Sequence, residues 1–257
     1  MTSKRWLLSA LLAWSACGAS FAADKPTSME FCHEDVDVYP WVLKDRPGLN
    51  VIHMRGVEQK LGIKFEILPL PWKRCQEELR EGKVDGIFAA SFKNERLEIG
   101  HYPMSSDKTD AARAMMYDGY SLYRLKGGSA QWDGSKLNVA GSVGAQPGYS
   151  IPDQLKQLGA RVDDGAKTAD DNLKKLVAGR VEAVALQTLE GDNAIATNAE
   201  FSAKVEKVKP PLVDKPFFLM LSKQFVAKYG DFSKDIWKTL AEVRESPDYK
   251  AKMGAFK

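Results

Sequence analysis

The sequence has little of what metal and nucleotide sites require. Its 257 residues include three histidines, at His33, His53 and His101. These positions lack the spacing of zinc ligands, so we do not expect a zinc enzyme or another metal site. The glycine-rich segment 141–148 is not followed by the Lys-Ser/Thr pair of a P-loop. We therefore expect no cofactor.

Long runs of one charge are also missing. The chain has 37 Lys and Arg residues against 34 Asp and Glu residues, a formal net charge of +3, and Lys4 and Arg5 carry two of these charges. Nucleic-acid binders show a clustered basic face, so this class of protein is not expected. The apolar content of 44% is enough for a packed core, in one large domain or two small ones.

No long apolar segment follows the first two dozen residues. The apolar run 6–16 comes after Lys4 and Arg5 and is too short to span a bilayer comfortably. Ser20 and Ala22 are small residues at the two positions that a signal peptidase reads, which predicts cleavage near Ala22 and export. A membrane anchor and lipid modification of Cys17 are the alternatives.

Cys32 and Cys75 are the two cysteines left after this cleavage. Cys32 ends the predicted strand 29–32, and Cys75 lies in the first turn of the helix after the second strand. If these strands are neighbours, both sulfurs lie at the same end of one sheet. An oxidising compartment permits a disulfide between them, and two free buried thiols are the alternative.

Strands and helices alternate over residues 29–89. The predicted elements are a strand at 29–32, a helix at 50–61, a strand at 64–68, a helix at 73–81 and a strand at 84–89. Gly62 and Gly82 follow the two helices as stop signals. The last strand is apolar on both faces, as buried parallel strands are. This order predicts an α/β sheet with right-handed crossovers.

A weak internal repeat follows. Residues 61–65 match 158–162, and residues 79–87 match 176–184, both at an offset of 97 residues. Two matches at a constant offset indicate two α/β lobes of similar build, and coincidence is the alternative. The segment 111–126 looks like a crossing strand. The chain then returns to the first lobe through an apolar strand at 217–221 and a helical tail at 225–252.

Four segments carry a resemblance to a known family: LGIKFEILPLPW, LREGKVDGIFAASFKNER, the GYS turn and AGRVEAVALQ. In this order the chain resembles the bacterial extracellular solute-binding proteins of family 3, the polar amino-acid type. Cys32 with the PWKRC segment is similar to one subgroup. The resemblance implies a type II periplasmic-binding-protein fold of two lobes, each a mostly parallel sheet flanked by helices and joined by two hinge segments. The predicted divisions are residues 1–22 as signal peptide, 23–117 as the first part of lobe one, 118–212 as lobe two and 213–257 as the return to lobe one.

In lobe one, the family's carboxylate-binding arginine corresponds to Arg96. A planar guanidinium donates to both oxygens of a carboxylate, although a surface ion pair is the alternative role. Ala89 and Ser91 match the family's small-residue turn, where Ser91 could instead cap the helix that follows. Trp72 and Tyr39 are expected to cover the ligand with aromatic faces, or to pack in the core.

In lobe two, Tyr149 and Ser150 belong to the matching Gly-Tyr-Ser turn before a helix, where free backbone N–H groups favour an anion. The family's Asp that pairs with a ligand ammonium is replaced here by the neutral Gln187. Glu190 could take its place, and so could a carboxylate of the first loop. The candidates in that loop are Glu34, Asp35 and Asp37.

The resemblance implies a monomeric periplasmic receptor that captures a small carboxylate-bearing solute, such as an amino acid, and delivers it to an ABC permease. No catalytic residue is expected. A periplasmic lyase or dehydratase on the same fold is an alternative, with Glu190 or His33 as its acid or base. A ligand-binding accessory to a sensory system is another.

Overall fold

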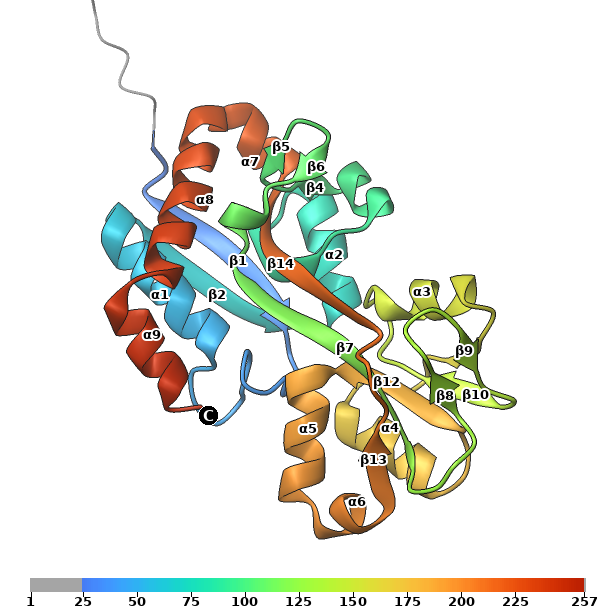
Figure 1. The fold of residues 1–257 in the computed structure, drawn as a ribbon. Coiled ribbons are helices and arrows are strands. Elements are labelled where there is room, and N and C mark those ends of the chain that lie inside the picture. Colours follow the sequence, from blue (N-terminus) through green and yellow to red (C-terminus); the bar gives the residue numbers. More distant parts are fainter. Residues whose placement is uncertain (1–24, 257) are drawn as a thin grey trace, which may run out of the picture.

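The computed structural model describes residues 25–256, so the predicted signal segment and Cys17 lie outside the described residues. The chain forms two lobes of mixed α/β structure joined by two long strands (Figure 1). Lobe one contains strands β1, β2 and β3, and lobe two contains β10, β11 and β12. Among the described residues no helix has the length and apolar character needed to cross a membrane.

The first part of the chain builds most of lobe one. Its elements are β1 (Ser28–Glu34), α1 (Leu49–Leu61), β2 (Lys64–Leu70), α2 (Trp72–Glu81), β3 (Gly86–Ser91), the 3-10 helix η1 (Asn94–Glu98), β4 (Gly100–His101), β5 (Met104–Ser105), β6 (Lys108–Thr109) and the 3-10 helix η2 (Ala111–Arg113).

The chain then crosses to lobe two and returns. The elements here are β7 (Met116–Leu125), β8 (Gln131–Trp132), β9 (Leu137–Asn138), β10 (Ser142–Gly144), α3 (Ile151–Gln157), β11 (Arg161–Asp163), α4 (Ala169–Val177), β12 (Ala183–Gln187), α5 (Thr188–Thr197), α6 (Ala199–Lys204) and β13 (Val205–Lys207). The return consists of β14 (Val213–Ser222), α7 (Lys223–Lys228), α8 (Gly230–Arg244) and α9 (Pro247–Gly254).

One sheet runs through both lobes in the order β11-β10-β12-β7-β14-β3-β1-β2. In lobe one, β2, β1 and β3 are parallel, and β14 pairs with β3 in the antiparallel sense. In lobe two, β11, β10 and β12 are parallel, and β7 pairs with β12 in the antiparallel sense. The strands β7 and β14 pair with each other between the lobes. The predicted mostly parallel sheets and the two crossing segments are confirmed.

The internal repeat corresponds to repeated structure. The pairs β2 and β11, α2 and α4, and β3 and β12 begin at residues 64 and 161, 72 and 169, and 86 and 183, each 97 residues apart. Gly82 and Gly179 follow the paired helices with φ of +69° and +67°, the left-handed conformation that ends helices at glycine. The lobe boundaries predicted at residues 117/118 and 212/213 stay a prediction.

Several element limits differ from the prediction. The third strand begins at Gly86 instead of Val84 and runs on to Ser91. Strand β2 continues through Pro69, which the sheet tolerates because β2 is its edge strand. The single helical tail is three helices. The backbone leaves the helical conformation at Tyr229, between α7 and α8, and Ser246 caps the start of α9 with a side-chain hydrogen bond.

The core of lobe one lies between the sheet and the helices α1 and α8. Phe31 and Phe65, on neighbouring strands, place their rings 4.7 Å apart in an edge contact. Trp237 on α8 is buried against the sheet and donates from Nε1 to the carbonyl of Leu219 at 2.9 Å. Each such buried side chain contributes about 1.5–3 kcal/mol by leaving water, and together they hold β1 and β3 rigid where they reach the cleft.

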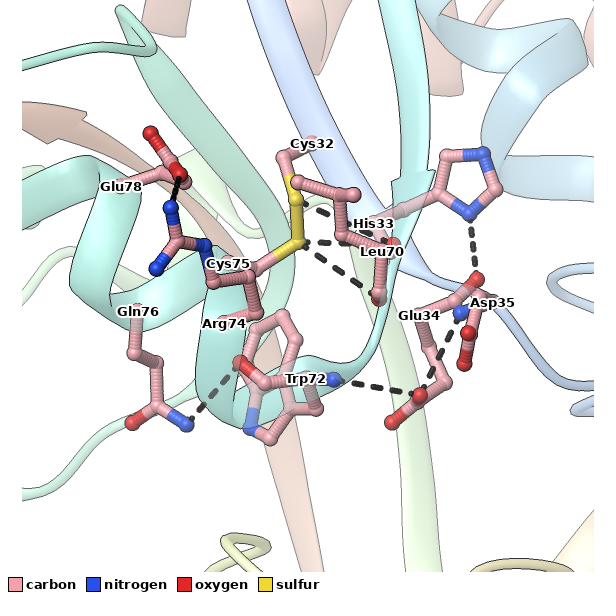
Figure 2. The surroundings of a disulfide bond; sticks show 10 residues. All are labelled: Cys32, His33, Glu34, Asp35, Leu70, Trp72, Arg74, Cys75, Gln76 and Glu78. Atoms are coloured by element: carbon pink, nitrogen blue, oxygen red, sulfur yellow. Dashed lines mark hydrogen bonds and ion pairs between the residues drawn. A yellow bond between two sulfur atoms is a disulfide. The ribbon is translucent and has the colours of Figure 1, made fainter.

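The predicted disulfide between Cys32 and Cys75 is present (Figure 2). It joins β1 to the first turn of α2, with Cα atoms 5.7 Å apart, and both residues are fully buried. Its two anchor points lie beside Glu34 and Trp72, and the backbone N–H of Trp72 donates to Oε1 of Glu34 at 3.3 Å. The bond therefore fixes the end of β1 against the start of α2.

We predict that the double variant Cys32→Ala/Cys75→Ala loses about 2–4 kcal/mol of unfolding free energy. The disulfide joins two residues 43 positions apart, and without it the unfolded chain gains conformational entropy. Urea unfolding of both proteins measures this loss. Mass spectrometry after alkylation, with and without reductant, provides the control. An alkylation pattern unchanged by the reductant would contradict the disulfide itself.

Candidate functional site

A cavity of about 40 Å³, called the central cavity below, lies between the lobes, where the carboxyl ends of β1, β3 and β12 meet. This is the position at which open α/β sheets hold ligands. Its lining includes six residues singled out from the sequence: Trp72, Ala89, Ser91, Arg96, Tyr149 and Gln187. The other lining residues are His33, Glu34, Val38, Val42, Phe88, Tyr120 and Phe217.

The end of β3 is shaped by a bulge. The pairing of β3 with β14 shifts register between Phe218 and Met220, and Ala89 has a φ of +64°. A left-handed alanine costs on the order of 1 kcal/mol, and such strain is concentrated at functional sites. Ala89 and Ser91, on either side of Ala90 at this end of the strand, both line the central cavity.

Arg96 follows β3 on η1 and is 4% exposed. It donates from Nη1 to the carbonyl of Ser91 at 2.7 Å, from Nη2 to the carbonyl of Gly148 at 2.9 Å and from Nε to Oε1 of Gln76 at 3.3 Å. Among residues 25–256 no carboxylate forms an ion pair with it. The Tyr102 hydroxyl is a further hydrogen-bond partner of the Arg96 side chain. The charge is buried without a counterion.

The carbonyl of Gly148 joins the lobes. It accepts from Nη2 of Arg96 and also, at 3.1 Å, from Nε1 of Trp72. The Trp72 ring lies 5.4 Å from the Arg96 guanidinium carbon, within range of a cation–π contact. Gly148 has a φ of +76°, and a Cβ there would lie 3.1 Å from the side chain of Lys73. The position therefore favours glycine both for its backbone conformation and for the close approach of the lobes.

A second contact between the lobes connects two serines. The hydroxyl of Ser91 donates to Oγ of Ser150 at 2.9 Å, and Ser150 also accepts from Nζ of Lys215 at 3.1 Å. Ser91 therefore does not cap η1, which begins after Lys93 without a side-chain cap. Lys215 comes from the crossing strand β14 and was not singled out from the sequence, because nothing local in that strand indicates its neighbours.

Glu34 gives the central cavity a carboxyl group from lobe one. It ends β1 and accepts from the backbone N–H groups of Trp72 and Asp35, both at 3.3 Å (Figure 2). Burial, with the nearby Asp35 charge, raises the pKa of Glu34 to about 7. The neighbouring His33 ring contacts the Glu34 carbonyl through Nδ1 at 2.7 Å, and burial lowers the pKa of His33. Asp35 and Asp37 do not line the cavity.

Lobe two contributes the buried groups Gln146, Gln187 and Glu190. Glu190, in the first turn of α5, accepts from Nε2 of Gln146 at 3.1 Å. Burial raises the pKa of Glu190 to about 8. The side-chain oxygens of Gln146 and Gln187 have no hydrogen-bond donor in the part of the chain that the structure describes. Burial also raises the pKa of Tyr149, and the carboxyl groups of Glu34 and Glu190 add to this effect.

Tyr39 does not line the central cavity. Its hydroxyl donates to the carbonyl of Phe256, near the end of the described chain, and its ring packs 6.2 Å from that of Phe256. It borders a separate hollow, which it shares with Glu190. Glu34, which the sequence offered only as an alternative, lines the central cavity instead. Within residues 25–256 no group of three or more His, Cys, Asp or Glu side chains could hold a metal ion.

Because the folded protein binds the Glu190 proton more tightly than the unfolded chain, stability falls as the pH rises from about 4.5 towards 8. We predict that Glu190→Gln, which keeps an acceptor for Gln146, is more stable than the parent at pH 8 by on the order of 4 kcal/mol. The difference shrinks towards zero at pH 4.5. Thermal unfolding across this pH range measures it.

The matched control is Asp107→Asn, which neutralises an exposed carboxylate in the turn between β5 and β6. This variant should follow the parent at every pH. A Glu190→Gln curve parallel to the parent's would show that the Glu190 carboxyl is ionised in the folded protein.

Comparison with known proteins gives a clear likeness in structure. No family model matches the sequence, and no curated protein matches it either. An ancestral arginine-binding protein bound to glutamine superposes with a TM-score of 0.70 at 19% identity, covering 91% of this chain and 99% of that one. The binding component of an ABC transporter from Wolinella succinogenes, complexed with lysine, gives 0.70 at 17% identity, with 88% and 93% covered.

A third solved structure is an ancestral amino acid-binding protein that is a precursor of cyclohexadienyl dehydratase. It gives a TM-score of 0.66 at 17% identity, with 90% of this chain and 95% of that one covered. These similar structures are amino-acid-binding proteins, the class that the sequence resembles. Identities this low carry information about fold alone. The chain has the two-lobed fold of the periplasmic binding proteins.

Proposed function

We propose that this chain is an exported solute-binding protein that captures a small carboxylate-bearing solute in the central cavity and delivers it to an ABC permease. Amino acids and related polar metabolites are the solute class. The signal segment directs the chain to the periplasm, where it acts as a monomer. Two of the similar solved structures support this solute class, since one is bound to glutamine and the other to lysine.

The buried and unpaired guanidinium of Arg96 carries this proposal. A buried charge without a counterion is costly, and it persists where a ligand supplies the opposite charge. A planar guanidinium can donate two parallel N–H bonds to the two oxygens of a carboxylate. Trp72 covers one face of the guanidinium and Ser91 lies beside it, so the site combines a charge, a hydroxyl and an aromatic face.

The lobes must separate to admit the solute. About 40 Å³ has room for a few water molecules, far less than an amino acid occupies. The contacts across the cleft within the described residues include Gly148 with Trp72 and Arg96, Ser91 with Ser150, Glu34 with Tyr149, and an ion pair between Lys93 and Asp153. They lie across the cleft, while the paired strands β7 and β14 stay joined. This arrangement supports a hinge motion in which the closed form is what the permease recognises.

A periplasmic lyase or dehydratase is the second candidate. The carboxyl group of Glu34 faces the central cavity with a pKa near 7, which suits a general acid. Turnover of prephenate-like acids, followed by loss of substrate absorbance, separates this candidate from binding alone. A protein that binds such an acid and returns it unchanged is a receptor. Whether a sensory partner reads the closed form depends on proteins outside this chain.

We predict that Arg96→Ala abolishes ligand-induced stabilisation. Protein stripped of bound solute by unfolding and dialysis is screened by thermal shift against amino acids and simple carboxylates. A solute that raises the parent's melting temperature should bind the variant at least about 100-fold more weakly, because a buried bidentate pair is lost. Arg96→Lys should recover part of the affinity, since lysine supplies the charge without the planar fork.

Arg80→Ala is the matched control, because it removes an exposed arginine from α2 in the same lobe. It should bind like the parent. Circular dichroism verifies that every variant is folded. An equal ligand-induced shift in Arg96→Ala and the parent would rule out carboxylate binding by Arg96.

A further inference from the structure

Lys215 is a second cation beside the central cavity, and the fold gives it no counterion. Its Nζ donates to Oγ of Ser150 at 3.1 Å and lies 5.2 Å from the centre of the Tyr120 ring, which lines the cavity. The side chain is half-buried. Within the described residues no carboxylate comes within ion-pair distance of it. A partly buried ammonium of this kind gains from an added anion.

Lys215 and Arg96 are connected through the two serines. Lys215 donates to Ser150, Ser91 donates to the same oxygen, and Arg96 donates to the carbonyl of Ser91. Two positive charges therefore flank one pair of hydroxyl groups. Burial, and after it the Arg96 charge, lowers the pKa of Lys215 to about 8. An anion bound at the serine pair would attract both cations and offset their repulsion.

Asp118 is the cross-strand partner of Lys215 on β7, but its carboxylate accepts from Nε1 of Trp41, and no ion pair within the described residues joins it to Lys215. The two acids Glu34 and Glu190 do little to neutralise the two cations. The pKa values of Glu34 and Glu190 are raised to about 7 and about 8, so near neutral pH both carboxyl groups carry a reduced negative charge. The strand β12 ends in the neutral Gln187 at the cavity wall. The central cavity therefore has Arg96 in its wall, with Glu34 and Gln187 as weakly charged or neutral acceptors in the same wall. Lys215 lies behind Ser91, which lines the cavity, and is connected to it through Ser150.

Resting on the proposed function, we infer that Lys215 binds a second acidic group of the solute, so that the solute is a small dicarboxylate. One carboxylate lies on Arg96, and the other is held by Lys215 with the hydroxyl groups of Ser91 and Ser150. Because Lys215 belongs to the crossing strand β14 and Ser150 to lobe two, the second carboxylate is recognised when the lobes close. A monocarboxylate of the same shape leaves Lys215 unpaired.

The test compares acids with their amides, which match closely in shape and differ by one charge. Isothermal titration calorimetry at pH 7 uses four pairs: L-glutamate with L-glutamine, L-aspartate with L-asparagine, glutarate with glutaramate and succinate with succinamate. In every pair that binds, the dicarboxylate should bind at least about tenfold more tightly, as expected for a desolvated charge pair.

Three variants locate the preference. Lys215→Met should bind the acid and the amide of a pair with similar affinity, and Lys215→Arg should keep the preference for the acid because it keeps the charge. Lys167→Met removes an exposed lysine of lobe two and serves as the control for net charge. It should behave like the parent. A purely structural role of Lys215 would weaken both members of a pair equally.

The outcomes separate the two proposals. Equal affinity for acid and amide in the parent, or a preference that survives in Lys215→Met, overturns the inference while carboxylate capture stands. Binding of no carboxylate at all, with Arg96→Ala and the parent alike, overturns the proposed function and this inference with it.

Discussion

The structure around the cleft depends on how one buried positive charge is held. Arg96 donates to a carbonyl of each lobe, Ser91 from its own and Gly148 from the other. Carbonyl dipoles solvate a guanidinium without neutralising it, so the charge stays available to an anion. Three features accompany this arrangement: the bulge at Ala89, the absence of a side chain at Gly148, and the contact of the Trp72 ring with the guanidinium. The positive charge of Arg96 in the cavity wall therefore has no carboxylate partner within the described residues.

The two crossing strands connect this charge to the lobe motion. Asp118 of β7 and Lys215 of β14 are partners in the register between these strands. Their side chains hold different lobes: Asp118 accepts from Nε1 of Trp41 in a loop of lobe one at 2.8 Å, and Lys215 donates to Ser150 of lobe two. This pair of register partners thus provides a side-chain contact to each lobe. Burial raises the pKa of Asp118 to about 6, so this contact occurs in a poorly solvated environment.

Local sequence patterns predicted the features that depend on neighbouring residues, such as helix ends and the order of strands and helices. Glycine at helix ends, apolar strands and the 97-residue repeat gave the α/β order and the paired lobes, and the position after β3 led to Arg96. The sequence did not predict contacts made by distant returns of the chain. Lys215 donates to Ser150, which is 65 residues away in the sequence. Tyr39 donates to the carbonyl of a residue 217 positions further along and does not line the cavity. The local sequence pattern does not indicate such long-range contacts. Gln187 indicated that the family's carboxylate is missing at this position, but the sequence did not show which group replaces it.

The main path of the sheet, which passes through both lobes, ends at β11 and β2, and the short strands β13 and β4 branch from it. Unpaired edge strands can recruit a strand from another chain, and this is a common route to aggregation. Here β11 is three residues long, and β2 contains Pro69, which lacks the N–H that a new partner would need. Pro69 therefore makes β2 a poor partner for an added strand. These two strands therefore offer a second copy of the chain little backbone to pair with.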